Sequence, residues 1–300
     1  MIAGFPCQTF SIVGKRAGFE DERGKIIYSL IEIMKQKNVK YFILENVKGL
    51  INHDKGNTFQ IIMETLDELG YKVVGVDKEQ TLLNKKFIGK KENLIRTPQK
   101  FGIPQKRARI FLMGFKKEDI PSNYNFPKLP ENNNLTIYKD LNDLIEKKVE
   151  PKYYLSQTNL QTLINHKNRH QKKSSGFGYI VVNDQKNPIA NTIMATGGSG
   201  KERNLIRQYR KEYIGLDIKG KKSPLNVEGI RYMTPTEWGK LQGFINYAFI
   251  DEDGKDNFKF PENISNTQRY KLFGNSVCIP IIESMAKYMI KRLEEFYEAK

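Results

Sequence analysis

The first 115 residues alternate between two hydrophobic patterns. Residues 26–37 and residues 58–69 carry apolar side chains at helical spacing, and each segment is followed by a short apolar run. These runs, over 41–44 and 71–76, predict strands. Helices that alternate with strands are typical of an α/β fold with a parallel sheet. We therefore expect Glu45 at the carboxyl end of its strand, where open α/β sheets place their ligands.

The pattern changes in the second part of the chain. From about Pro121 the periodicity fades into polar sequence, with a short helical stretch near 141–148, so we expect a domain boundary there. Glycines and short apolar runs over 174–206 indicate turns and small strands. The hydroxyl, proline and glutamate of 234–237 predict the start of a helix. A last amphipathic helix is predicted over 279–296.

Composition indicates a globular protein. Three hundred residues with 39% hydrophobic content can bury a core, and no run of 18 or more apolar residues predicts a membrane span. The N-terminus lacks the order of regions found in a signal peptide, so we expect a cytoplasmic protein. The two cysteines, Cys7 and Cys278, and three scattered histidines form neither a disulfide framework nor a zinc-ligand spacing, and no metal is expected.

The formal net charge of +16 indicates a polyanionic partner, most simply nucleic acid. The alternative is ordinary solvated surface, because Lys and Asn are abundant throughout the chain, as an AT-rich coding bias would produce. The motifs below agree with a nucleic-acid partner.

Four short clusters, which occur along the chain in a fixed order, contain the candidate catalytic and binding residues. They are Gly4-Phe5-Pro6-Cys7-Gln8 with Ser11, Glu45-Asn46-Val47, Gln105-Lys106-Arg107-Ala108-Arg109, and Gly274-Asn275-Ser276-Val277. A Pro-Cys pair alone is weak, because a lone cysteine is usually a small buried hydrophobe. In this order the clusters resemble the DNA (cytosine-5)-methyltransferases. The matching stretches are residues 4–19, 41–50, 101–115, 231–244 and 268–277.

The resemblance implies a Rossmann-like, S-adenosylmethionine-dependent methyltransferase sheet of the α/β class with an inserted small target-recognition domain. The catalytic domain would comprise 1–125 and 264–300, with its last helix packed on the sheet, and the recognition domain would be 126–263. Family members begin with an FxGxG turn and two acidic residues that hold the cofactor, and neither is found here. We expect an N-terminally truncated or split enzyme that lacks roughly 70 to 80 residues, about two strand–helix–strand units, and leaves an unpaired strand edge.

The chemistry of cytosine methylation assigns roles to two of the clusters. Position 5 of cytosine is a poor nucleophile, so a nucleophile must first add at C6, and the thiolate of Cys7 is the candidate. Its alternative is a buried inert thiol, the interpretation we favour for Cys278. Glu45 is placed to protonate or hydrogen-bond N3, the alternative being a strand-end cap, and Asn46 would hold the loop geometry.

Arg107 and Arg109 alternate, so on a strand that starts there both would project to the same face. Guanidinium groups can hold the cytosine O2 and a phosphate. The resemblance gives the cytosine contact to Arg109 and a supporting role to Arg107. The target base would have to flip out of the duplex. Residues 10–19 resemble the mobile loop that closes over the flipped base, with Ser11 on a phosphate.

The remaining site residues follow from the resemblance. Residues expected to line the S-adenosyl-L-methionine pocket are Pro6, Asn275, Ser276 and Val277, although Gly-Asn-Ser alone is an ordinary turn before a helix. The glycines over 197–200 do not match a phosphate-binding P-loop. Residues expected to contact the base or DNA are Phe5, Gln8, Ser11, Lys15, Asn46, Gln105, Thr192, Lys201 and Arg203, with Arg207 as a further candidate.

Three functions remain open from the sequence. The first is a restriction-modification enzyme that methylates cytosine in duplex DNA, either with a separately encoded N-terminal fragment as a partner or as a fragment of a longer reading frame, with a cognate endonuclease in the same system. The second is a catalytically inactive remnant that binds DNA. The third is an RNA methyltransferase of the eukaryotic tRNA-aspartate type, which shares two of the clusters. The large insertion over 121–261 favours DNA.

Overall fold

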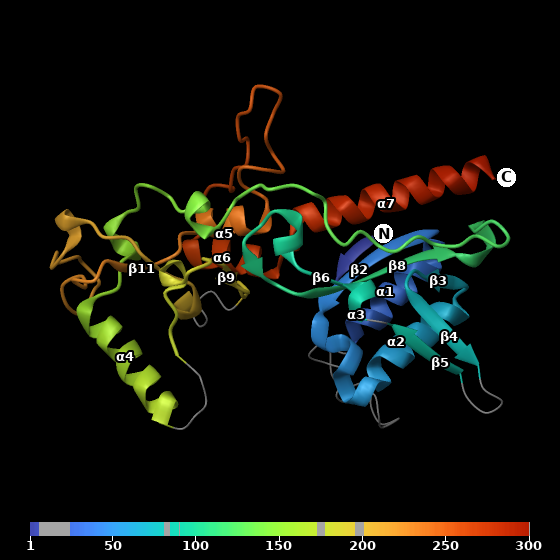
Figure 1. The fold of residues 1–300 in the computed structure, drawn as a ribbon, viewed down its shortest axis with the longest axis horizontal. Coiled ribbons are helices and arrows are strands. Elements are labelled where there is room, and N and C mark those ends of the chain that lie inside the picture. The colour runs from blue at the N-terminus through green and yellow to red at the C-terminus, as the bar shows by residue number, and fades with distance from the viewer. Residues whose placement is uncertain (6–24, 81–84, 90, 173–177, 196–200, 300) are drawn as a thin grey trace. The chain divides into compact units, whose positions relative to one another are not determined.

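The structure is a computed structural model (Figure 1) that divides into two compact units. The first unit comprises Met1–Thr97, Ala108–Asn133 and Ile281–Lys300, and the second comprises Pro98–Arg107 and Asn134–Pro280. The residues that the structure describes are 1–5, 25–80, 85–89, 91–172, 178–195 and 201–299.

The unit limits differ from the domain limits expected from the sequence at two places. Residues 98–107 and 264–280 belong to the second unit, whereas the sequence pattern joined both to the catalytic domain. The junction near residue 133 and the return of the last helix to the first unit lie close to the expected positions.

The first unit is built on a five-stranded sheet with the order β1-β2-β8-β3, in which β6 also pairs with β8. Its strands are β1 (Ile2–Gly4), β2 (Tyr41–Val47), β3 (Tyr71–Val73), β6 (Ile95–Arg96) and β8 (Arg109–Lys116). Its main helices are α1 (Lys25–Gln36), α2 (Asn57–Glu68) and α7 (Ile279–Glu298), with the short α3 (Lys91–Leu94) and a separate hairpin of β4 (Val76–Gln80) and β5 (Lys85–Gly89).

The expectation of a parallel sheet holds for β1 and β2 but is wrong for the rest. Strand β8 lies between β2 and β3 and runs antiparallel to both. Its six central residues are buried, and β8 is hydrogen-bonded to neighbouring strands along both of its edges. β2 and β3 still run in the same direction, as the alternating helices predict, but they are not neighbours.

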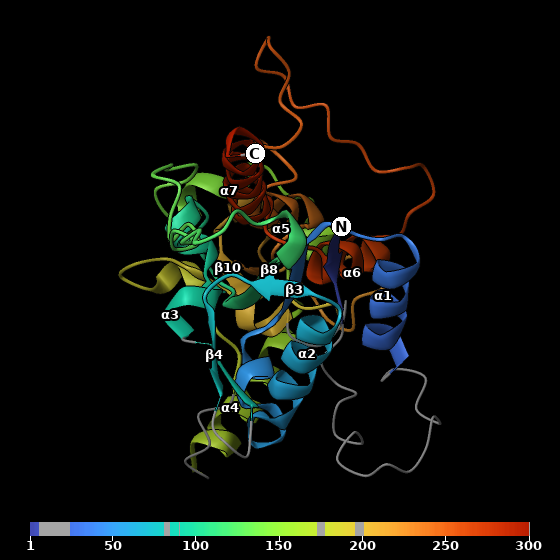
Figure 2. The same ribbon diagram turned by 90° about the vertical axis from the view of Figure 1, so that its right-hand side faces the viewer.

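Helices cover both faces of this sheet (Figures 1 and 2). α1 and α2 lie on one face, where Phe42 and Leu44 of β2 share a buried cluster with Ile62 of α2. α7 lies on the other face, and the ring of Phe296 meets that of Phe115 on β8 at a centroid distance of 5.4 Å. Both the predicted position of the last helix and its packing on the sheet are confirmed. The result is a three-layer α/β sandwich.

The second unit consists of short strands and helices joined by long irregular segments. Its strands are β7 (Gln105–Lys106), β9 (Ala190–Asn191), β10 (Leu205–Arg207) and β11 (Ile230–Tyr232), and its helices are α4 (Gln157–Lys172), α5 (Pro235–Gln242) and α6 (Asn266–Asn275). A small core of Leu155, Leu160, Leu205 and Ile230 holds α4 to the β10–β11 pair. The small strands expected over 174–206 are confirmed by β9 and β10.

The start of α5 is fixed by a buried network in the second unit. The Thr234 hydroxyl accepts from the Glu237 N–H, and the Glu237 carboxylate accepts from the Thr234 N–H, which is the predicted helix start. Arg231 donates to both carboxylate oxygens of Glu237 at 2.7 and 2.9 Å, and both side chains are fully buried. Arg231–Phe244 is one of the stretches that match the methyltransferase pattern, and the residues of its first half thus have a structural role in the fold.

Among the residues described, no helix combines the length and the apolar character needed to cross a membrane.

Candidate active site

Three strand ends meet at one edge of the first unit's sheet. Gly4, the last residue of β1, pairs in register with Glu45 of β2, and the two strands run parallel. β8 runs the other way, so its first residue, Arg109, pairs with Val47 at the end of β2. The fold therefore brings Gly4, Glu45 and Arg109 together from three separate parts of the chain.

The side chains of Glu45 and Arg109 form an ion pair at this edge. Arg109 Nε lies 3.0 Å from Glu45 Oε1, and the arginine and glutamate side chains are 16% and 13% exposed. Burial lowers the pKa of Arg109, and the neighbouring carboxylate opposes that effect. A guanidinium remains charged under these conditions. The sheet edge thus presents a carboxylate and a cation that are largely shielded from solvent and hold each other in place.

Asn46 is the buried neighbour of this pair and is 2% exposed. Its Oδ1 accepts from the N–H of Val47 at 2.7 Å, which fixes the side chain against its own strand end. Its Nδ2 has no acceptor within the part of the chain that the structure describes. A buried amide donor normally has a partner, so the Asn46 NH2 group can donate to a group that lies beside the strand end.

The segment that carries the expected nucleophile lies outside the described residues, and with it Pro6, Cys7, Gln8, Ser11 and Lys15. What leads to it is described. Phe5 donates its N–H to the Glu45 carbonyl at 3.4 Å. The expected contact of Phe5 with the base is not seen, because its ring is 6% exposed and packs in the sheet core. Cys7 follows Gly4 by three residues, a span of about 10 Å at most.

Arg107 does not share a strand face with Arg109. That expectation is wrong because β7 ends at Lys106 and β8 begins only at Arg109. Arg107 belongs to the second unit, is 4% exposed, and donates to three backbone carbonyls. These are the carbonyls of Ile193 at 2.9 Å, Gly274 at 3.2 Å and Ser276 at 2.9 Å. The guanidinium joins two chain segments of its own unit.

The Gly274–Val277 cluster forms the end of α6 and the turn toward α7. A Cβ on Gly274 would lie 2.4 Å from the backbone of Met194, so only glycine allows this approach. The Ser276 hydroxyl donates to the Phe273 carbonyl at 2.8 Å. The buried Gln242 side chain donates to the same Phe273 carbonyl at 2.8 Å and to that of Ser276 at 3.2 Å. Sequence reasoning missed Gln242, and its only signal was its place in a matching stretch.

Two other expected DNA contacts hold the second unit together. Gln105 is fully buried, donates to the Leu241 carbonyl at 2.7 Å and accepts from the Ile193 N–H at 3.3 Å, which leaves no surface for DNA. The Thr192 hydroxyl donates to the Lys106 carbonyl. Both side chains connect the β7–β9 pair to its surroundings.

The basic candidates of the second unit lie around β10. Lys201 and Arg203 occupy a short 3-10 turn, Lys201–Asn204, just before that strand. The Arg203 carbonyl accepts from the Asn191 side chain at 2.7 Å. Arg207 is paired with Asp184 at 3.0 Å and Glu228 at 3.6 Å, so two carboxylates compete with any phosphate for its charge.

The described residues fit one side of an S-adenosyl-L-methionine site. The Asn275 side chain is exposed and that of Val277 is half-buried, so the turn presents an amide and an apolar group. Ser276 contributes less, since its hydroxyl and carbonyl already have partners within the unit. A ligand site normally encloses most of its ligand. These three residues would form at most one wall of such a site and do not enclose a ligand by themselves.

Comparisons with known proteins agree on one family. A model of the C-5 cytosine-specific DNA methylases matches residues 1–291. The type II methyltransferase M.HpaII of Haemophilus parainfluenzae is 40% identical, over 99% of this chain and 73% of its own length. M1.ScrFI of Lactococcus lactis subsp. cremoris is 36% identical, over 98% of this chain and 63% of its own length. The chain thus spans 73% of the first relative and 63% of the second.

Solved structures share the fold. The Entamoeba histolytica methyltransferase EhMeth superposes with a TM-score of 0.59 at 18% identity, covering 97% of this chain and 77% of that one. The DNMT2 of Spodoptera frugiperda gives a TM-score of 0.57 at 20% identity, covering 96% of this chain and 78% of that one. The Rossmann-like methyltransferase fold expected from the sequence is confirmed.

Proposed function

The chain belongs to the C-5 cytosine-specific DNA methylases, and on that premise we propose that it methylates C5 of a cytosine flipped out of duplex DNA, within a restriction-modification system. The observation that carries the proposal is the sheet edge of the first unit. There the Glu45–Arg109 ion pair lies beside the end of β1, three residues before Cys7. Nucleophile, acid and cation would thereby act on one base.

Cys7 would add its thiolate to C6 of the cytosine, which raises electron density at C5. Glu45 would protonate or hydrogen-bond N3 and so neutralise the charge that addition leaves on the ring. The register between Glu45 and Gly4 supports this role, because β1 and β2 are parallel and both end at the same edge of the sheet. Asn46 would use its Nδ2 donor to hold the segment that carries Cys7.

Arg109 would bind the cytosine O2. Its guanidinium holds Glu45 in the absence of a base, so a base carbonyl that arrives at the edge would find a donor already oriented. Arg107 would act at a distance from the base. Its three carbonyl partners support a positioning role, in which it fixes the turn at Gly274 to the segment around Ile193.

S-adenosyl-L-methionine, when bound, would supply the methyl group as a sulfonium donor. Asn275 and Val277 would form one wall of its site, with Ser276 between them and Pro6 as a further contact. The turn is held in shape from behind by Gln242 and Arg107, which bind the carbonyl of Ser276.

Residues 1–125 and 264–300 would form the catalytic domain, and 126–263 the target-recognition domain. Gln8, Ser11 and Lys15 would lie near the base and its phosphates, and Phe5, buried in the sheet core, would anchor the start of their segment. Thr192 and Gln105 would support the recognition domain from inside, while Lys201 and Arg203 would meet the DNA backbone. The net charge of +16 supports a duplex partner.

The test is transfer of labelled methyl from S-adenosyl-L-methionine to mixed-sequence duplex DNA by the purified chain, alone and with a second polypeptide that carries the FxGxG segment. Transfer to DNA under either condition, and not to tRNA, supports the proposal. Failure under both conditions favours the alternative, an inactive DNA-binding remnant. Transfer only with the second polypeptide identifies a split enzyme.

A further inference from the structure

A second arginine lies beside Arg109 at the same edge of the sheet. Arg96, the last residue of β6, pairs in register with Arg109 of β8, and the two strands run antiparallel. Residues directly opposite each other in such a pair point to the same face, with their Cα atoms about 5 Å apart. The two guanidinium groups therefore start from neighbouring positions on one face, and the proposed reaction gives Arg96 no role.

Glu45 shares this face and lies on the other side of Arg109. β8 is hydrogen-bonded to β2 along one edge and to β6 along the other. Arg109 Nε lies 3.0 Å from Glu45 Oε1, so the arginine turns toward β2. Side chains alternate along a strand, and Phe115 therefore points to the same face as Arg109, where its ring contacts that of Phe296 on α7. Arg96, Arg109 and Glu45 thus form a row on the face that α7 covers.

Arg96 is almost fully buried, and it donates to backbone carbonyls. Its side chain is 3% exposed and donates to the carbonyl of Leu129 at 2.8 Å and to that of Pro130. Burial lowers the pKa of Arg96, as it lowers the pKa of Arg109, but a guanidinium remains charged. Two like charges therefore lie next to each other in this row.

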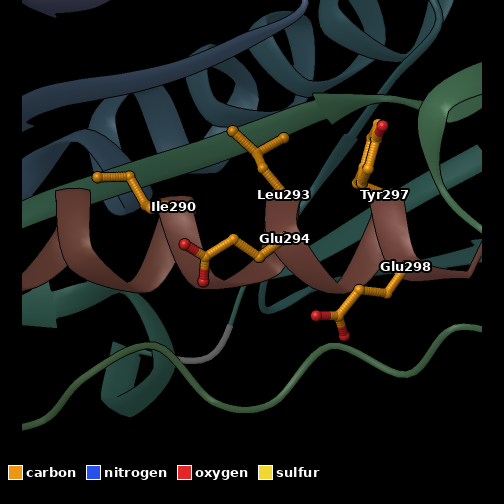
Figure 3. A pocket seen from close by; sticks show the side chains of 5 residues that line it. All are labelled: Ile290, Leu293, Glu294, Tyr297 and Glu298. Carbon is orange, nitrogen blue, oxygen red and sulfur yellow. The ribbon is translucent and has the colours of Figure 1, made fainter.

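The two carbonyls belong to the return segment, residues 121–131, which follows β8 and runs along α7 (Figure 1). Tyr288 of α7 donates to another carbonyl of this segment, that of Pro127, at 2.6 Å. Figure 3 shows the segment on the side of α7 opposite Ile290 and Leu293. The return segment thus places carbonyl acceptors beside the sheet edge, within reach of a long cationic side chain.

Without Arg96, these carbonyls would compete with Glu45 for Arg109. A buried carbonyl that lacks a donor is costly, and the Arg109 side chain starts only about 5 Å from that of Arg96. In the structure Arg96 already occupies the carbonyls, and its charge repels a second guanidinium from that side. One orientation remains for Arg109, the one in which it binds Glu45.

We propose that Arg96 is a positioning residue, which occupies the carbonyls of the return segment and so keeps Arg109 turned toward Glu45 and the incoming base. Arg96 acts on the base only through Arg109. The inference rests on the proposed function in one respect, that Arg109 binds the cytosine O2. The orientation of Arg109 does not depend on that role and is measured without DNA.

The test is the exchange of the Arg109 Nε–H with solvent, followed by proton–nitrogen NMR on the full chain, in which the Arg109 signal is the one that Arg109→Lys removes. Exchange should be slow, because the group is shielded and bonded to a carboxylate. Arg96→Leu should accelerate it about tenfold or more. Arg96→Gln, which drops the charge but keeps an amide donor, should accelerate it less. Arg96→Lys, which keeps the charge and a donor, should leave it slow.

Tyr288→Phe is the matched control, since it removes a different donor from the same return segment and leaves Arg96 in place. Its Arg109 signal should match that of the unmodified chain. A second readout is adduct formation on 5-fluorocytosine DNA. Arg96→Leu should lower its rate by about 10- to 100-fold with DNA affinity unchanged, the effect of misplacing a group that contacts the base.

Fast exchange of the Arg109 Nε–H in the unmodified chain overturns the inference, and so does exchange that neither Arg96→Leu nor Arg96→Gln accelerates. An equal acceleration in Tyr288→Phe also overturns it, because loosening of the return segment alone would then account for the effect. If Arg96→Leu does not fold, Arg96→Gln decides the test. Faster exchange together with a normal adduct rate would refute the proposed role of Arg109 at the base and leave its positioning by Arg96 standing.

Discussion

At the scale of single residues, the chemistry of the site depends on the side chains that the sheet edge already orients before a cytosine binds. Glu45 and Arg109 are already paired at 3.0 Å and largely buried. A charged pair in such a place is costly to leave incomplete, because the remaining charge loses its partner. The pair therefore serves the fold as well as the proposed chemistry, and variants must separate the two.

Glu45→Gln keeps the size of the side chain and its place in β2 but removes the acid. Addition at C6 should slow by about 10²- to 10⁴-fold, the range typical of a lost general acid. The measurement is the rate of adduct formation on duplex DNA that contains 5-fluorocytosine, with added cofactor-binding polypeptide. Glu68→Gln, an exposed carboxylate on α2, is the control. A near-normal rate for Glu45→Gln would remove Glu45 from the N3 role.

Cys7→Ser should abolish the covalent adduct on 5-fluorocytosine DNA and leave DNA affinity unchanged, since a serine hydroxyl is far from ionised at neutral pH. Gel mobility of the denatured complex measures the adduct, and titration measures affinity. The control is Cys278→Ala, which alters the other, buried cysteine and should still give the adduct. An adduct that persists in Cys7→Ser would identify a different nucleophile.

At the scale of elements, the turn after α6 connects two distant segments of the second unit. Its close approach to Met194 requires glycine at 274, and Arg107 and Gln242 bind its carbonyls. The turn is thus shaped by partners within its own unit. That is how three residues at the end of a helix can present Asn275 and Val277 in a fixed orientation.

Gly274→Ala should destabilise the chain by about 1–3 kcal/mol, the cost of forcing a methyl group against backbone atoms that cannot move aside. Urea unfolding measures the decrease in stability. Gly49→Ala is the matched control, because a Cβ there meets nothing within 4 Å. If both variants unfold at the same urea concentration, the approach of Met194 to Gly274 is looser than the structure has it.

Local patterns predicted the elements whose signals are local. The capping box at Thr234, helix α7 and helices α1 and α2 follow from periodicity and end residues, and the structure has them within two residues of the expected limits. Helix α4 was missed because Leu160 is its only buried residue among those described. The β4–β5 hairpin was missed as well.

Long-range arrangements were the part that could not be predicted. Nothing in the sequence of β8 says that it enters between β2 and β3, since its apolar residues suit any central position. The same limit applies to the site. Glu45 could be placed at a strand end from its own segment. Arg107 and Arg109 have separate surroundings because β8 starts at Arg109, two residues after the predicted start at Arg107.

At the scale of the whole molecule, several of the basic side chains that contribute to the net charge of +16 already have partners within the protein. Arg207 is neutralised by Asp184 and Glu228, and Arg231 by Glu237. Arg107 donates to backbone carbonyls inside the second unit. Phosphate contacts must therefore come from other basic residues, and the candidates that the sequence predicted are Lys201 and Arg203 in the turn before β10.

Replacing Lys201 and Arg203 with alanine should weaken duplex binding and flatten its dependence on salt, by about 0.9 in the log–log slope for each phosphate that the protein no longer neutralises. Affinity is measured between about 50 and 200 mM salt, the range over which phosphate neutralisation weighs most. Lys35→Ala with Lys37→Ala is the control of equal charge, because the C-terminal end of α1 leads into β2 at the edge of the sheet opposite Glu45. If the two double variants reduce the slope equally, the effect is one of net charge alone, and the turn before β10 has no place in the DNA interface.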